Sequence, residues 1–95
     1  MKEAKHCAER LYGLTDPARL LIVQLLRRGP HTVSQIAEAL DSTLVNTSYH
    51  LNILKRCGIT EALPQGRHVL YRLRPDVYGD DDCLDFGCCK LRLPA

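Results

Sequence analysis

The chain has 95 residues, 45% of them hydrophobic and 5% aromatic, and it contains no tryptophan. This predicts one small domain with a modest core. No apolar run approaches the length of a membrane span, and the start MKEAKHCAER is amphipathic and unlike a signal peptide, so we expect a cytoplasmic protein with no membrane partner. Five basic residues stand against one acid between residues 42 and 74, whereas four acids stand against two bases between residues 80 and 95. The positive charge therefore gathers in the middle of the chain.

The first half of the chain has the spacing of amphipathic helices. Apolar residues recur at helical intervals over residues 2–14, which predicts a first helix ending near a turn at Gly13. A second helix is predicted after its N-cap Thr15, with Asp16 and Pro17 in its first turn, and it ends near Arg27 and Arg28. Thr32 and the residue three positions later, Gln35, have the spacing of a capping box, which predicts a short third helix.

The stretch from Thr43 to Gly58, TLVNTSYHLNILKRCG, predicts a fourth helix with two different faces. The face toward a core holds Thr47, His50, Leu51 and Leu54. The opposite face holds Val45, Tyr49, Asn52 and Arg56, with Ser48 on its flank, and the stretch contains no acid. Such groups can reach base edges and phosphates in a major groove, although an ordinary solvated helix face is the alternative.

After Gly58 the pattern changes to the alternation of a β-hairpin, with a turn at residues 64–66 and with Val69, Tyr71 and Leu73 pointing inward. Its tip and outer edge carry polar groups suited to a phosphate backbone, namely Gln65, Arg67, His68 and Arg72. A helix-turn-helix followed by a basic hairpin predicts a mainly α winged helix-turn-helix over residues 1–75. Residues 76–95 are predicted to form an acidic loop and a cysteine-containing tail.

Four segments together resemble the ArsR/SmtB family of small bacterial winged-helix repressors: LTDPARLLIVQLL, TVSQIAEAL, SYHLNILKRCGI and GRHVLYRL. The resemblance covers roughly Leu11 to Leu73. It implies a homodimer that binds an imperfect palindrome in double-stranded DNA and is released by a ligand or a redox change. The family's base-reading positions fall on Thr43, Leu44, Val45, Ser48, Tyr49 and Asn52, and we add Arg56, Arg67, His68 and Arg72 to the predicted DNA-binding set.

The chain also departs from the family pattern. Leu44 and Val45 stand where polar residues are more usual, so apolar contact with a thymine methyl group or a smaller share of direct readout is expected. The third-helix segment has no cysteine, and no C-terminal helix carries the Asp and His residues of an interface zinc site. Without an evident fifth helix, we expect dimerisation through the first helix and the tail.

The five cysteines are an odd number and do not suggest a secreted disulfide framework. Cys83, Cys88 and Cys89 have the number and softness for a trigonal thiolate site that takes arsenite or a soft divalent metal ion. Residues 88–93 alternate as in a strand, which would point adjacent thiols apart unless the chain bends at Gly87.

Two other interpretations of the tail stay open. In one, the thiols sense redox change and a tail cysteine pairs with Cys83, Cys7 or Cys57. In the other, Cys89 packs as a small hydrophobe and Cys88 has no role. Cys7 and Cys57 themselves stand where small buried residues would serve.

The sequence thus favours a DNA-binding regulator, and the alternative class is a winged-helix interaction or dimerisation module that binds no DNA. His50 lies beside core leucines and is predicted to be a structural, hydrogen-bonded histidine and not a ligand. We expect no enzyme, because the Ser, His and Asp residues fall in no catalytic motif and no phosphate-binding loop is present.

Overall fold

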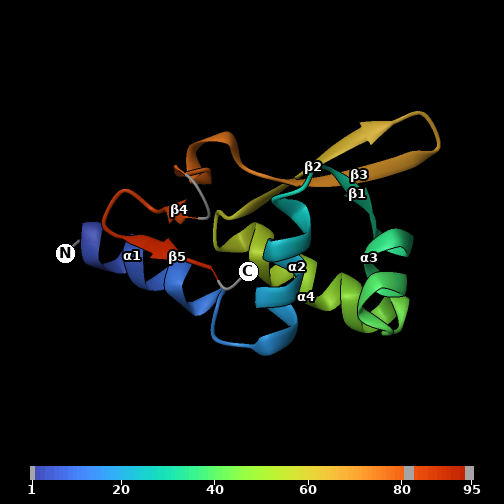
Figure 1. The fold of residues 1–95 in the computed structure, drawn as a ribbon, viewed down its shortest axis with the longest axis horizontal. Helices are drawn as coiled ribbons and strands as arrows, with labels where there is room; N and C mark the ends of the chain where they lie inside the picture. The colour runs from blue at the N-terminus through green and yellow to red at the C-terminus, as the bar shows by residue number, and fades with distance from the viewer. Residues whose placement is uncertain (1, 81–82, 94–95) are drawn as a thin grey trace.

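The computed structural model describes residues 2–80 and 83–93. Its helices are α1 (Lys2–Tyr12), α2 (Pro17–Leu26), α3 (Val33–Leu40) and α4 (Leu44–Arg56), with a 3-10 turn η1 (Pro75–Val77). Its strands are β1 (His31–Thr32), β2 (Thr60–Gln65), β3 (His68–Leu73), β4 (Cys83–Asp85) and β5 (Lys90–Arg92). The helices gather on one side, and the β2–β3 hairpin extends away from them (Figure 1). This order confirms the predicted winged helix-turn-helix.

Short polar side chains cap the starts of α2, α3 and α4, as the sequence predicts, but the capping residue of α2 differs from the predicted one. The Thr15 cap is wrong: Asp16 caps α2 by accepting a hydrogen bond of 2.8 Å from the Ala18 backbone N–H. The Thr15 hydroxyl instead donates to the carbonyl of Tyr12. The capping box of Thr32 with Gln35 is confirmed. Local hydrogen bonding by these side chains satisfies amide groups that have no partner within the helix.

A tight connection joins α3 to α4 and sets the helix-turn-helix. Asp41 ends α3 in the left-handed region at φ 51°, and the Ser42 amide donates to the carbonyl of Ala37 at 2.9 Å. Thr43 then caps α4 by accepting from the Asn46 amide at 3.0 Å. The three residues between the helices therefore serve to end α3 and to begin α4.

The wing is part of a three-stranded antiparallel sheet in the order β1-β3-β2. Gln65 pairs with His68, so the turn consists of Gly66 and Arg67 and not of residues 64–66 as predicted. Gly66 adopts φ 59°, which a glycine reaches without strain. Pro64 lies within edge strand β2, where a missing N–H is tolerated.

The prediction that Val69 of the wing points inward is wrong. Leu73 is fully buried and Tyr71 partly so, but Val69 is 41% exposed. Val69 pairs with Pro64 near the hairpin tip and lines an open groove with Ser34 and Gln35 at the start of α3. The alternation is that of a strand, but only the half of β3 nearer the helices faces the core.

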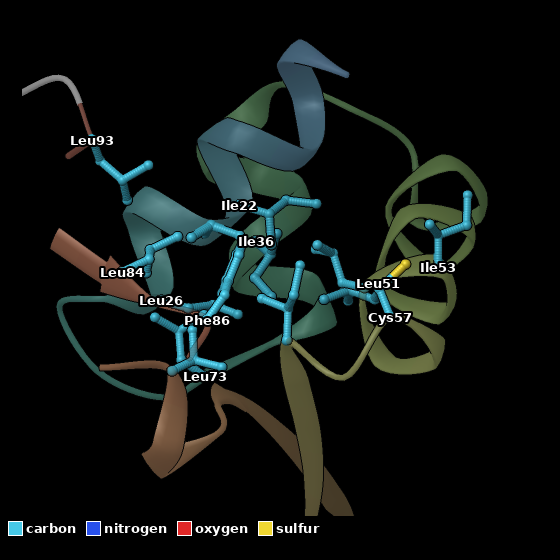
Figure 2. Packing of buried hydrophobic residues seen from close by; sticks show 14 residues of the cluster. Ile22, Leu26, Ile36, Leu51, Ile53, Cys57, Leu73, Leu84, Phe86 and Leu93 are labelled. Carbon is cyan, nitrogen blue, oxygen red and sulfur yellow. The ribbon is translucent and has the colours of Figure 1, made fainter. Parts of the chain in front are cut away.

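The core lies where the helices meet the base of the wing. Leu26, Ile36, Leu51 and Leu73 are fully buried in it, with Phe86 from the tail beside them (Figure 2). The rest of the tail follows, since Val77, Leu84 and Leu93 join the same cluster. Residues 76–80 and 83–93 therefore pack on the helical unit through a shared core.

The tail forms a β4–β5 hairpin. Its predicted alternation is confirmed, because Leu91 and Leu93 face inward while Lys90 and Arg92 are exposed. Part of the predicted acidic loop, Asp81 and Asp82, lies outside the described residues. None of the described helices is long and apolar enough to cross a membrane.

Candidate functional site

The outward face of α4 exposes both apolar and polar side chains. Val45 is 79% exposed and Tyr49 59%, and Asn52 and Arg56 continue the same face. Leu44 is 55% exposed at the start of the helix, and Ser48 is half-buried on its flank. Helix α4 contains no acidic residue, so the face carries no charge that would repel a phosphate.

The inward face of α4 fixes the direction in which that surface points. Thr47, Leu51 and Leu54 are each no more than 2% exposed. The Thr43 hydroxyl accepts from Asn46, so this oxygen is engaged in the helix cap. The helix is therefore held at its start and along its length, and the outward side chains are presented from a rigid element.

His50 is confirmed as a structural histidine. Its Nδ1 lies 3.3 Å from Nη1 of the buried Arg19, whose Nε donates to the carbonyl of Gly13 at 2.9 Å. Arginine offers only donors, so Nδ1 is the acceptor in this contact. This network ties the middle of α4 to the loop between α1 and α2.

The tip of the wing carries the exposed cation Arg67, with His68 next to it. Arg72 is placed differently, because its Nε donates to Glu61 across the hairpin at 2.6 Å. The two side chains are about one third exposed. A groove between the wing and the start of α3 is lined by Ser34, Gln35, Arg67, His68 and Val69 among others. Among the described residues Arg67 has no ion-pair partner at the wing tip, whereas the charge of Arg72 is largely balanced by Glu61.

The cysteines divide into a cluster and two separate thiols. Cys7 of α1 forms a disulfide with Cys88, and the sulfur of Cys89 lies 3.9 Å from that of Cys88. The sulfurs of Cys7, Cys88 and Cys89 all lie within 4.8 Å of one another. Cys83 of β4 belongs to no such group among the described residues, although the sequence placed it in the predicted triad. Cys7 takes part in its place: it is only partly buried, and its pairing with a tail cysteine is one of those that the redox interpretation named.

Cys57 follows the sequence-based expectation. It is 9% exposed at the end of α4 and packs in the core. Burial raises the pKa of its thiol, and the nearby Arg19 opposes this only partly. A thiol held protonated in this way is a poor nucleophile and a poor ligand. Cys57 therefore belongs to the core and not to the cluster.

A buried arginine links α1 to the tail beside the cysteine cluster. Arg10 is 6% exposed, and its Nη2 donates to Asp76 at 2.9 Å. Its Nη1 lies 3.4 Å from the carbonyl of Phe86, and its guanidinium lies 5.8 Å from the centre of the Phe86 ring. The hydrogen bond from Arg10 is the main reason that the pKa of Asp76 is lowered from its usual value. No sequence motif marks this pair, whose members are 66 residues apart.

The fold is a winged helix-turn-helix of the kind that transcription regulators use, with the outward face of α4 and the tip of the wing exposed. The family model described as "Bacterial regulatory protein, arsR family" matches residues 16–61. The chain is 35% identical over 77 residues to the uncharacterized HTH-type transcriptional regulator MJ1325 of Methanocaldococcus jannaschii, covering 80% of this chain and 86% of that protein. It is 34% identical over 70 residues to the HTH-type transcriptional regulator NmtR of Mycobacterium tuberculosis, covering 74% of this chain but only 58% of NmtR.

A solved structure agrees with these relatives. The homodimeric winged helix-turn-helix DNA-binding domain of Mb0332 from Mycobacterium bovis, a possible ArsR-family transcriptional regulator, superposes with a TM-score of 0.73 at 32% identity. The match covers 76% of this chain and 67% of that one. The chain belongs to the ArsR/SmtB family of helix-turn-helix transcriptional regulators, which are not enzymes.

Proposed function

We propose that this protein is a homodimeric, sequence-specific DNA-binding repressor in which α4 enters the major groove and the wing follows the phosphate backbone. The observation that carries the proposal is the outward face of α4, which is exposed, free of acids and presented by a helix anchored in the core. The exposed Arg67 and His68 at the wing tip support the phosphate contacts.

The side chains of α4 suggest distinct roles. The Asn52 amide has the donor and acceptor pair that matches adenine, and Arg56 supplies a cation near the end of the helix. Leu44 and Val45 suit thymine methyl groups. Tyr49, Ser48 and Thr43 would complete the contact to bases and phosphates. A winged-helix interaction module would use the same exposed Leu44 and Val45 for protein contact, so absence of DNA binding at low salt would favour that class.

A dimer is supported by the apolar surface of α1. Leu11 is 38% exposed and Tyr12 56%, although both are large hydrophobic side chains. The Mb0332 domain is homodimeric. Burial of α1 between two protomers would place the two copies of α4 for adjacent turns of DNA, which matches a palindromic site.

The cysteines suggest the input that controls release. A soft ion such as arsenite or a soft divalent metal would bind thiolates, and an oxidant would pair them. The described residues gather three cysteine sulfurs within 4.8 Å, two of them joined in the Cys7–Cys88 disulfide, which supports a thiol-based input. The cysteine cluster is separate from the proposed DNA contacts, since none of its three cysteines lies on α4 or the wing.

The DNA proposal is tested with Asn52→Ala and Tyr49→Ala on a duplex selected by the wild-type protein and on a random duplex of the same length. Loss of one good base contact is worth about 1–3 kcal/mol. We expect each variant to lose affinity for the selected duplex and to keep its affinity for the random one. Lys90→Ala, an exposed change on β5, is the control and should alter neither. Equal losses on both duplexes would contradict base reading by α4.

A further inference from the structure

We infer that the groove between α1 and α4 binds the sugar-phosphate backbone of DNA, with Lys5 as a phosphate contact on α1 and Glu9 as an acid that limits affinity for DNA of any sequence. The groove has a volume of about 660 Å³ and is lined by Lys5, Glu9 and Tyr12 of α1 and by Tyr49, Ile53 and Arg56 of α4, among others. The inference rests on the proposed function, because it adds a second helix to the same DNA contact.

The groove continues the outward face of α4. Tyr49 is 59% exposed on that face, Arg56 is also exposed on it, and both side chains line the groove. A duplex that contacts Tyr49 and Arg56 therefore also comes within reach of the neighbouring side chains of α1. In Figure 1, α1 and the tip of the wing lie at opposite ends of the molecule, so α1 would hold the duplex on the side of α4 that the wing does not reach.

The charges along the groove favour a phosphate. Lys5 of α1 and Arg56 of α4 line its two walls, and Glu9 is the one acid among the described residues that line it. The ion pairs of the described residues involve none of these three side chains, so two bases against one acid leave a positive charge that is not balanced within the groove. Attraction between such cations and phosphates supplies the sequence-independent part of DNA affinity.

Close packing at the end of α1 fixes this helix against α4. A Cβ at Gly13, directly after α1, would lie 2.6 Å from Cδ1 of Ile59, so the chain packs there without room for a side chain. Nε of the buried Arg19 donates to the carbonyl of Gly13 at 2.9 Å, and Nη1 of the same side chain lies 3.3 Å from His50 of α4. The two walls of the groove are therefore joined, and Lys5 is presented from a fixed helix.

A dimer formed around α1 leaves the Lys5 side of this helix open. Lys5 lies about 120° around the helix from Leu11, an exposed apolar residue of the dimer surface. Tyr12 belongs to both surfaces, but it lies about 10 Å along the helix axis from Lys5. Such a dimer places both copies of α1 near the two-fold axis, so each Lys5 would meet a phosphate toward the centre of the palindrome.

Glu9 has the opposite effect to Lys5 in the same groove. A carboxylate beside a phosphate repels it, and this repulsion does not depend on the base sequence. Glu9 is exposed, so its effect on stability is small. Glu9 therefore keeps binding to random DNA weak without altering the base contacts of α4.

The groove is tested on the full-length protein by salt titrations with a selected and a random duplex. Lys5→Ala removes two phosphate contacts in a dimer, so the slope of log affinity against log salt should fall by about 1.8 on both duplexes. Lys2→Ala, which removes an exposed lysine of α1 outside the groove, is the matched control and should change the slope by much less. Glu9→Gln should tighten binding to both duplexes by at least about twofold at low salt, whereas Glu3→Gln should not.

The outcomes separate this inference from the proposed function. Absence of DNA binding by the wild-type protein would contradict the proposed function itself. Normal binding by the wild type together with an unchanged slope in Lys5→Ala, or an equal change in Lys2→Ala, would overturn the groove alone.

A second measurement locates the contact on the DNA. One phosphate at a time in the selected duplex is replaced by an uncharged methylphosphonate. Toward the centre of the palindrome we expect a position where the replacement weakens binding of the wild type by at least about threefold and leaves Lys5→Ala unaffected. If every replacement weakens binding of the two proteins equally, Lys5 contacts no phosphate and the inference is wrong.

Discussion

Arg67 and Arg72 both lie on the β2–β3 hairpin, and the sequence predicts that both contact phosphates. Their surroundings differ. Arg67 is exposed at the turn, whereas Arg72 is paired with Glu61 at 2.6 Å. Each phosphate contact adds about 0.9 to the slope of log affinity against log salt. In a dimer, Arg67→Ala removes two such contacts, so the slope should fall by about 1.8. Arg72→Ala should change it by much less, because binding through Arg72 must first disrupt the ion pair.

The difference is large enough to measure. Between 50 and 200 mM salt, a slope change of about 1.8 alters the loss of affinity by roughly tenfold. The assay is fluorescence anisotropy on one random and one selected duplex at five or more salt concentrations. Arg67→Ala should weaken binding to both duplexes alike, since phosphate contacts carry no sequence information. An equal slope for wild type and Arg67→Ala, or a larger change for Arg72→Ala, would refute this assignment of the wing.

Three predictions concern stability, measured by urea or thermal unfolding. Leu54→Ala empties a fully buried position and should cost about 2–5 kcal/mol, lowering Tm by at least about 8 °C, whereas Val69→Ser at the exposed tip should cost under about 0.5 kcal/mol; similar losses would contradict the burial difference. The lowered pKa of Asp76 means that its stabilisation is present above its ordinary pKa of about 3.9 and is lost as the pH falls through the lowered folded value. Asp76→Asn should therefore be less stable than the wild type at pH 7 and approach it near pH 3, and a constant gap would argue against the pairing with Arg10.

Local signals in the sequence predicted the helix-turn-helix well. These signals are the capping box at Thr32, the Thr43 cap and the apolar spacing of Leu51 and Leu54. Each signal involves residues that lie within one or two helical turns along the chain. Such short-range patterns determine which face is buried. The choice of Thr15 over Asp16 as the α2 cap was wrong because both residues are good caps and adjacent.

Long-range features could not be predicted in the same way. The two-residue strand β1 exists because His31 and Thr32 pair with β3, and so short a segment has no period of its own. The cross-link of Cys7 with Cys88 and the contact of Arg10 with Asp76 join residues more than 60 positions apart. Cysteine spacing alone gives no connectivity, so the sequence grouped Cys83 with its neighbours for an ion site and left Cys83, Cys7 and Cys57 as equal candidates for a disulfide with the tail. The tail meets α1 through the Cys7–Cys88 disulfide and the contacts of Arg10 with Asp76 and Phe86.

The most direct test of the account is selection from a random duplex library by the reduced, metal-free, full-length protein. The account predicts enrichment of an imperfect palindrome with half-site centres about one helical turn apart, as two copies of α4 in a dimer require. Enrichment should disappear in parallel selections by Tyr49→Ala and Asn52→Ala proteins and persist with the Lys90→Ala control. No enrichment by the wild-type protein even at low salt would contradict the central claim that α4 reads DNA.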